Sequence, residues 1–123
     1  MYELTIMTEF EAAHTIENYK GKCSRLHGHN WKVEVAVEGK KLDDLGMVID
    51  FREFKTKVNK VIEEFDHYYL NDLPSFQNTT PSAENISKYI FDTLQNKFSD
   101  EIVLKYIKVW ESPRSAVKYY LED

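Results

Sequence analysis

Three of the four histidines in this chain lie with its single cysteine in two short segments near the N-terminus. His14 ends the run Phe-Glu-Ala-Ala-His, and Cys23 stands shortly before a His-Gly-His run that contains His27 and His29. Imidazole nitrogen and thiolate sulfur are ligands that suit zinc in proteins. The residue types therefore predict a metal site, and zinc is the metal we expect.

The spacing of these histidines predicts that they face the same side of a sheet. In an extended chain, residues two apart point to one face. Counted in steps of two, His14 falls on the same face as the apolar positions of residues 2–14. His27 and His29 fall on the same face as Trp31 and the valines that follow it. An antiparallel pairing of the two segments would bring the three imidazoles together. A single inward histidine is more often a core residue bonded to a carbonyl, but three at one hairpin end favour a metal.

The spacing leaves two roles open for Cys23. As a fourth ligand it would close a structural zinc site, whereas as a free thiol it would lie beside an open three-histidine site of the catalytic kind. Lys22 and Arg25 flank it in a polar loop, which favours a partly exposed thiolate. The alternative is a small buried hydrophobic side chain.

Two further places carry groups that could hold or move protons. Asp66 and His67 are adjacent near the end of an expected helix, and a carboxylate beside an imidazole can orient it for proton transfer. The alternative is a helix C-terminal cap. Glu111 ends a mostly apolar strand face, where its carboxylate could accept two hydrogen bonds from the edge of a heterocycle. The alternative is a strand that simply emerges into solvent there.

Composition limits the kinds of protein that this chain can be. Its 123 residues, 42% of them hydrophobic, predict one domain that spans residues 1–123. One cysteine excludes an internal disulfide, and the opening residues do not form a leader pattern, so we expect a cytoplasmic protein. The net charge of −5 argues against a nucleic-acid partner, and no apolar stretch approaches the ~20 residues that would cross a membrane.

Hydrophobic periodicity predicts two helices after the first hairpin. Asp50 and Glu53 form a capping-box pattern, so we expect a helix to follow. Its buried positions would be Phe54, Val58, Val61, Ile62 and Phe65. Residues 71–80 are typical of a loop, and Pro81 suits the first turn of a second helix. That helix would bury Ala83, Ile86, Ile90, Leu94 and Phe98.

The C-terminal part predicts a second hairpin. Residues 102–111 and 116–121 are rich in β-branched and aromatic residues, and Val103 is expected on the face that ends at Glu111. The order β-β-α-α-β-β predicts an α+β fold with a four-stranded antiparallel sheet and two helices on one face. Such a sheet has open edge strands, so we expect assembly edge to edge into a closed barrel.

Six motifs in order along the chain resemble the 6-pyruvoyl-tetrahydropterin synthase family, also called the T-fold pterin-binding family. They are residues 10–14, 23–30, 46–51, 66–71, 81–85 and 109–111. The three residues between Cys23 and His27 resemble the 6-carboxy-5,6,7,8-tetrahydropterin synthase branch, since the pyruvoyl branch typically has a longer spacing. One departure is Trp31, where the family often has tyrosine.

The resemblance implies a ligand set and an anchor for the substrate. It implies that the three histidines bind a catalytic zinc ion that meets the side-chain hydroxyl groups of 7,8-dihydroneopterin triphosphate, which removes Cys23 from the ligand list. Glu111 resembles the pterin anchor and a member of the proton relay. Ser82 and Glu84 are weaker candidates for the pterin pocket. Arg25 and Arg114 are candidate triphosphate contacts, because each lies in a loop beside a proposed site residue of an acidic protein.

The resemblance also implies how protons move and what is made. Cys23 resembles the general base, and His67, supported by Asp66, resembles a proton relay. The expected enzyme is a zinc-dependent lyase that forms 6-carboxytetrahydropterin, acetaldehyde and triphosphate in queuosine and 7-deazapurine biosynthesis. The expected assembly is a homohexamer of two trimers with active sites between subunits. The alternatives are a pyruvoyl-type triphosphate lyase and a non-catalytic zinc or pterin binding module.

Overall fold

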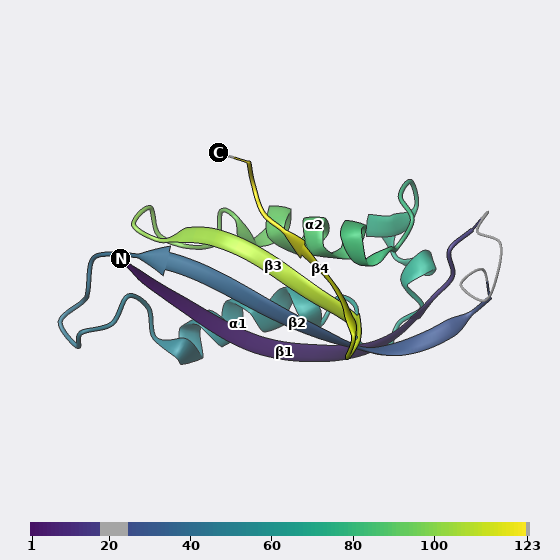
Figure 1. Cartoon of the computed structure of the whole chain (residues 1–123), viewed down its shortest axis with the longest axis horizontal. Coiled ribbons are helices and arrows are strands. Elements are labelled where there is room, and N and C mark those ends of the chain that lie inside the picture. Colours follow the sequence, from purple (N-terminus) through teal and green to yellow (C-terminus); the bar gives the residue numbers. More distant parts are fainter. Residues whose placement is uncertain (18–24, 123) are drawn as a thin grey trace.

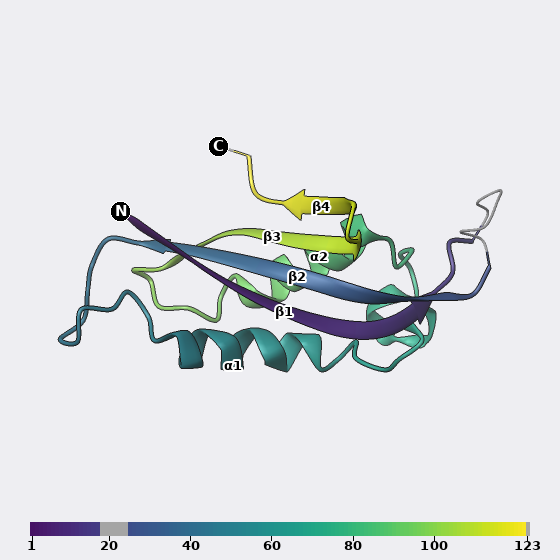
Figure 2. The same ribbon diagram turned by 60° about the horizontal axis from the view of Figure 1, so that its bottom comes forward.

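Within the described residues, 1–17 and 25–122, the chain folds into a four-stranded antiparallel sheet with two helices on one face (Figures 1 and 2). The computed structural model contains the elements in the predicted order. They are β1 (Tyr2–His14), β2 (His27–Gly39), α1 (Phe51–Ile62), η2 (Leu70–Asp72), η3 (Pro74–Phe76), α2 (Ala83–Leu94), β3 (Val103–Ser112) and β4 (Ser115–Tyr119). The sheet is open, with β1 and β4 at its edges. None of the helices in the described residues is long and apolar enough to cross a membrane.

The long hairpin of β1 and β2 keeps one register over its whole length. Pairing runs from Tyr2 opposite Gly39 to His14 opposite His27, without a shift. Because no residue is inserted, alternate side chains stay on the same face from one end to the other. The inward row of each strand therefore delivers its histidines to the same end of the hairpin.

The core lies between the sheet and the helices. Phe10 stacks on Trp31 with ring centroids 5.9 Å apart, and both are fully buried with Phe65 beside them. The remaining strand residues of this layer are Ile6, Ala12, Val33, Val35, Val37, Leu104, Ile107 and Val109. This burial confirms the parity predicted for the first two strands, and each large apolar side chain contributes about 1.5–3 kcal/mol.

Helix α1 begins where the capping pattern predicted. The Asp50 carboxylate accepts a hydrogen bond from the Arg52 N–H at 2.7 Å and so satisfies one free donor of the first turn. The buried face consists of Phe54, Val58, Val61 and Ile62, as predicted. The helix ends at Ile62, so Phe65 lies in the following turn, although it is fully buried.

Two predictions for the second helix are wrong at its ends. Pro81 precedes the helix, because Ser82 is the N-cap: its backbone is extended and its hydroxyl accepts from the Asn85 N–H at 3.2 Å. Phe98 lies beyond the end of α2 at Leu94 and packs edge-on against Phe54, with centroids 5.8 Å apart. The expected loop of residues 71–80 contains the short helix η3.

The parity predicted for the start of β3 is also wrong. Val103 is 55% exposed, whereas Leu104 is buried. The register of β2 and β3 shifts between Ala36 and Val37, and such a shift moves the following side chains to the opposite face. The register of β3 and β4 also shifts, between Trp110 and Ser112, at the site end of the sheet.

Candidate metal centre

The three predicted histidines meet at the end of the β1–β2 hairpin. The ring centroids of His14 and His27 are 4.5 Å apart, those of His27 and His29 are 4.6 Å apart, and those of His14 and His29 are 5.1 Å apart. Glu111 of β3 joins them, and the four potential ligand atoms all lie within 4.8 Å of one another. His14 is buried and the other three are half-buried. This centre thus combines residues from three strands.

Backbone carbonyls determine which nitrogen of two rings is free. The His14 Nδ1 lies 2.8 Å from the Pro81 oxygen, and the His27 Nδ1 lies 2.7 Å from the Arg25 oxygen. Because a carbonyl only accepts, each Nδ1 must donate its proton, and each Nε2 then presents a lone pair. The two Nε2 atoms are 2.9 Å apart. Two lone pairs at that distance repel each other, so either a proton on one ring makes a hydrogen bond between them or a metal cation lies beside both. Carbonyl-bound imidazoles of this kind are typical metal ligands.

The third imidazole has a buried nitrogen without a hydrogen-bond partner in the described part of the chain. This atom is the His29 Nε2, and a Glu111 carboxylate oxygen lies 3.2 Å from it without hydrogen-bond geometry. A buried polar atom left unpaired costs about 1–3 kcal/mol, so a ligand for it is expected. Three imidazole nitrogens with a carboxylate beside them form a donor set that suits zinc. The residues present therefore fit the metal that the sequence predicts.

The electrostatics of the centre favour neutral imidazoles. Burial lowers the pKa of His14, against the opposing effect of its hydrogen bond to Pro81 and together with the effect of His27. Burial also lowers the pKa of His29, against the opposing effect of the Glu111 carboxylate. The neutral form is the one that binds a metal, so these shifts prepare both rings as ligands.

A tryptophan packs behind the histidines. The Trp31 ring meets His14 and His29 edge-on, with centroids 5.0 and 5.1 Å away. Its Nε1–H donates to the carbonyl of Ala12 at 3.2 Å in the buried layer. Trp31 therefore holds two of the rings at fixed angles. Trp31 continues the inward row of His27 and His29, so strand parity alone predicts a position behind the metal site.

Asp66 and His67 lie beside the outer edge of β1, not at a helix end. The His67 N–H donates to the Glu11 carbonyl at 2.6 Å, and the Ala13 N–H donates to the Tyr68 carbonyl at 3.2 Å. Among the described residues, His67 is the one non-glycine residue with a positive φ, at 65°. Because α1 ends at Ile62, the helix-cap alternative for His67 is wrong.

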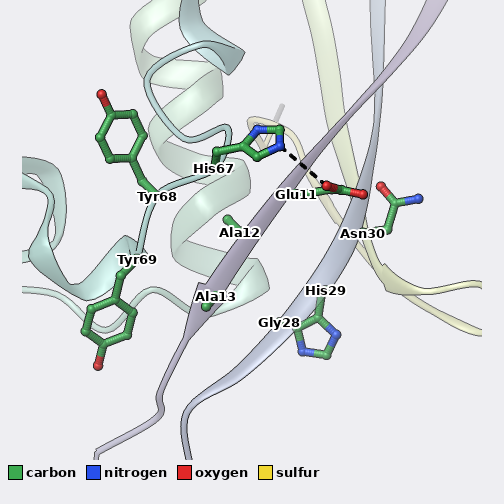
Figure 3. A pocket seen from close by; sticks show the side chains of 9 residues that line it. All are labelled: Glu11, Ala12, Ala13, Gly28, His29, Asn30, His67, Tyr68 and Tyr69. Carbon is green, nitrogen blue, oxygen red and sulfur yellow. Dashed lines mark ion pairs between the residues drawn. The ribbon is translucent and has the colours of Figure 1, made fainter.

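The carboxylate and imidazole of this pair are in contact, as predicted. Asp66 Oδ1 lies 3.0 Å from His67 Nδ1 and accepts from the Glu11 N–H at 2.9 Å. That N–H, followed by the contact with His67, holds the pKa of Asp66 below its usual value. His67 of this pair lines a cavity of about 480 Å³. The lining residues are Glu11, Ala12, Ala13, Gly28, His29, Asn30, His67, Tyr68 and Tyr69 (Figure 3).

The three histidines His14, His27 and His29, called the metal group below, are separate from the Asp66–His67 pair within one chain. His67 is not among the residues whose ligand atoms converge, and its side chain is 73% exposed. Figure 3 shows the His67 ring directed toward Glu11, with the His29 ring at the other end of the cavity. The structure therefore brings Glu111 to the histidines but does not bring His67 to them.

The two candidates for the pterin pocket lie at the start of α2. The Ser82 hydroxyl caps the helix, which gives it a structural role in the chain as it stands. Glu84 is exposed in the first turn. Ser82 follows Pro81, whose carbonyl holds His14, so the start of α2 is tied to the metal group.

The remaining predicted residues lie in the loops around the site. Arg25 is exposed, and its carbonyl rather than its guanidinium holds His27. Arg114 is exposed in the turn between β3 and β4. Cys23 lies in the segment 18–24, outside the described residues, so its predicted role stays a prediction.

Comparisons with known proteins extend over nearly the whole chain. The family model described as 6-pyruvoyl tetrahydropterin synthase matches residues 3–122. The 6-carboxy-5,6,7,8-tetrahydropterin synthase of Synechocystis is 36% identical over 116 residues, which cover 90% of this chain and 87% of that protein. A protein from Archaeoglobus fulgidus that carries the same name provisionally is 47% identical over 92 residues, 75% of each chain. The solved structure of Caenorhabditis elegans 6-pyruvoyl tetrahydropterin synthase matches with a TM-score of 0.87 and 27% identity, over 98% of this chain and 96% of that one.

Proposed function

The chain belongs to the 6-pyruvoyl tetrahydropterin synthase family, and within it we propose that this protein is a zinc-dependent 6-carboxy-5,6,7,8-tetrahydropterin synthase. It would convert 7,8-dihydroneopterin triphosphate to 6-carboxytetrahydropterin, acetaldehyde and triphosphate, in the cytoplasm, on the route to queuosine and other 7-deazapurines. The observation that carries this proposal is the convergence of His14, His27 and His29 beside Glu111. The names of the bacterial and archaeal relatives support the carboxy branch.

In this proposal the metal group and Glu111 bind different parts of the substrate. The Nε2 atoms of the three histidines would hold zinc, which would polarise the side-chain hydroxyl groups of the substrate and lower their pKa. Glu111 would accept two hydrogen bonds from the amino group and ring N–H of the pterin. The Glu111 carboxylate lies 3.2 Å from the His29 Nε2, so the proposed anchor and the metal group are neighbours in one chain.

Proton transfer is assigned to the cysteine and to the Asp66–His67 pair. Asp66 accepts from the Nδ1–H of His67, which orients the ring and directs its Nε2 away from Asp66. Cys23 is proposed as the base from the family resemblance. Cys23→Ala should therefore keep its zinc while turnover falls by about 10² or more, the usual scale for a general base. Loss of zinc from that variant would instead make the cysteine a ligand.

We place each active site between subunits of a homohexamer built from two trimers. The open edges of β1 and β4 are available for closing a barrel, and His67 lies outside the metal group of its own chain. His67 of one subunit would then act on substrate held at the metal group of another. Mixing His27→Ala subunits with His67→Ala subunits should give more activity than either impaired variant has alone. No recovery after verified subunit exchange would put both groups in a site within one chain.

A pyruvoyl-type lyase is the second candidate, because a solved structure of that name shares the fold over nearly the whole chain. The deciding experiment incubates the zinc-loaded protein with 7,8-dihydroneopterin triphosphate and identifies the pterin product by mass. The carboxy product with acetaldehyde supports the proposal, and the pyruvoyl product overturns it in favour of the second candidate. If neither forms while zinc and neopterin still bind, the protein is a binding module.

A further inference from the structure

Glu11 contacts the Asp66–His67 pair in three ways, although sequence reasoning gave it no role. Its N–H donates to Asp66 Oδ1 at 2.9 Å, and its carbonyl accepts from the His67 N–H at 2.6 Å. Its side-chain Oε2 lies 3.5 Å from His67 Nε2, at ion-pair distance (Figure 3). The first two contacts belong to the backbone, so only the third depends on the residue type.

The third contact places His67 between two carboxylates. Asp66 lies at Nδ1 and Glu11 at Nε2, on opposite sides of the ring. The His67 side chain is 73% exposed, so packing within the chain does little to fix the orientation of its ring. The backbone at φ 65° is held by pairing with β1, but the side-chain torsions remain free to rotate without these two contacts. A ring that must meet a substrate in one orientation needs both ends restrained.

We propose that Glu11 is a positioning residue for His67, whose side-chain carboxylate restrains the Nε2 end of the imidazole at the cavity. This inference rests on the proposed function, in which His67 transfers a proton. Glu9 provides a matched comparison, because it lies on the same face of β1 and is also exposed. Its carboxylate accepts from Asn30 at 3.2 Å instead of facing His67. The two glutamates therefore differ in the contact on which the proposal depends.

Steady-state kinetics of the zinc-loaded enzyme test the proposal. An exposed charge pair contributes little, so Glu11→Ala should lower kcat about fivefold while KM changes by less than about twofold. Glu11→Gln keeps an acceptor oxygen for an Nε2–H and should regain most of the lost kcat. Glu9→Ala should match the unchanged enzyme. A rise in KM alone, or equal losses in Glu9→Ala and Glu11→Ala, would overturn the positioning role.

A second comparison asks whether Glu11 acts through His67. In a His67→Ala background, Glu11→Ala should cause no further loss of turnover, because the group that it positions is absent. A further loss of similar size would show that Glu11 acts on its own and would overturn the proposal. Both backbone contacts survive these substitutions, and far-UV circular dichroism verifies that the fold is kept.

A measurement independent of turnover separates this proposal from the proposed function. The NMR resonances of the His67 imidazole in the zinc-loaded full chain should shift in Glu11→Ala and stay in place in Glu9→Ala. If the His67 resonances shift only in Glu11→Ala but the enzyme does not turn over the pterin triphosphate, the proposed function is wrong and the positioning of His67 by Glu11 is still supported. If they do not respond, the positioning role is refuted even where turnover is normal.

Discussion

Glu111→Gln tests whether the carboxylate beside the histidines recognises the pterin or binds the metal. The substitution keeps the size of a side chain that lies 3.2 Å from the His29 Nε2. As an anchor, Glu111 loses one of its two acceptor oxygens, and an amide donor then faces a pterin donor. Such a mismatch costs about 1–3 kcal/mol, so the Kd for neopterin should rise about 5- to 150-fold. The three imidazoles remain, and zinc should stay stoichiometric.

Two assays on the same protein separate these roles. Zinc content is measured after competition with a chelator, and neopterin affinity is measured by fluorescence titration with zinc bound. Glu38→Gln is the control, because that carboxylate lies on β2 near Gly39, at the opposite end of the hairpin. Weaker zinc binding with unchanged affinity of the loaded protein for neopterin would refute the anchor role and make Glu111 a metal ligand.

The remaining predictions concern the histidines and their support. His27→Ala should abolish stoichiometric zinc, and retained zinc by metal analysis would mean a different ligand set. Trp31→Phe should lower the free energy of unfolding of the metal-free chain by about 2–3 kcal/mol in urea, because the Ala12 carbonyl loses its donor and the ring is smaller. An unchanged free energy of unfolding would mean that this hydrogen bond does not contribute to stability. Because the pKa values of His14 and His29 lie below 6.5, the unfolded chain binds protons first on acidification. Metal-free stability should thus fall as pH drops below 6.5, and a rise in the urea midpoint would contradict this.

The sequence predicted the metal group because the hairpin that carries it has an unbroken register. Counting by two from Phe10 to His14 and from His27 to Trp31 gives the true faces only if no residue is inserted in either strand, and none is. The same counting failed at Val103, where the register of β2 and β3 shifts. A shift of this kind depends on how two strands pair, and neither strand alone contains a pattern that predicts it.

The position of His67 could not be predicted in the same way. Helical periodicity continued to Phe65 because this side chain is buried, yet the helix ends at Ile62 and the chain then turns toward the edge of β1. A left-handed backbone at a histidine has no local sequence signal, since glycine is the residue that normally adopts it. Hydrogen bonds to Glu11 hold it there, and they join residues that are far apart in sequence.

Strand parity explains both the success at His14 and the omission of Glu11. Glu11 and His14 are three residues apart on one strand, so their side chains must point to opposite faces. Parity therefore predicted that Glu11 faces solvent. That assignment is correct for burial, because Glu11 is exposed and His14 is buried. It is incomplete for function, because the outward face at this end of β1 has the segment with His67 beside it. One short stretch of β1 thus carries the buried His14 of the candidate metal centre on one face and contacts the exposed His67 on the other. Under the proposed function, a substrate that needs both must reach them from two chains or around the strand edge.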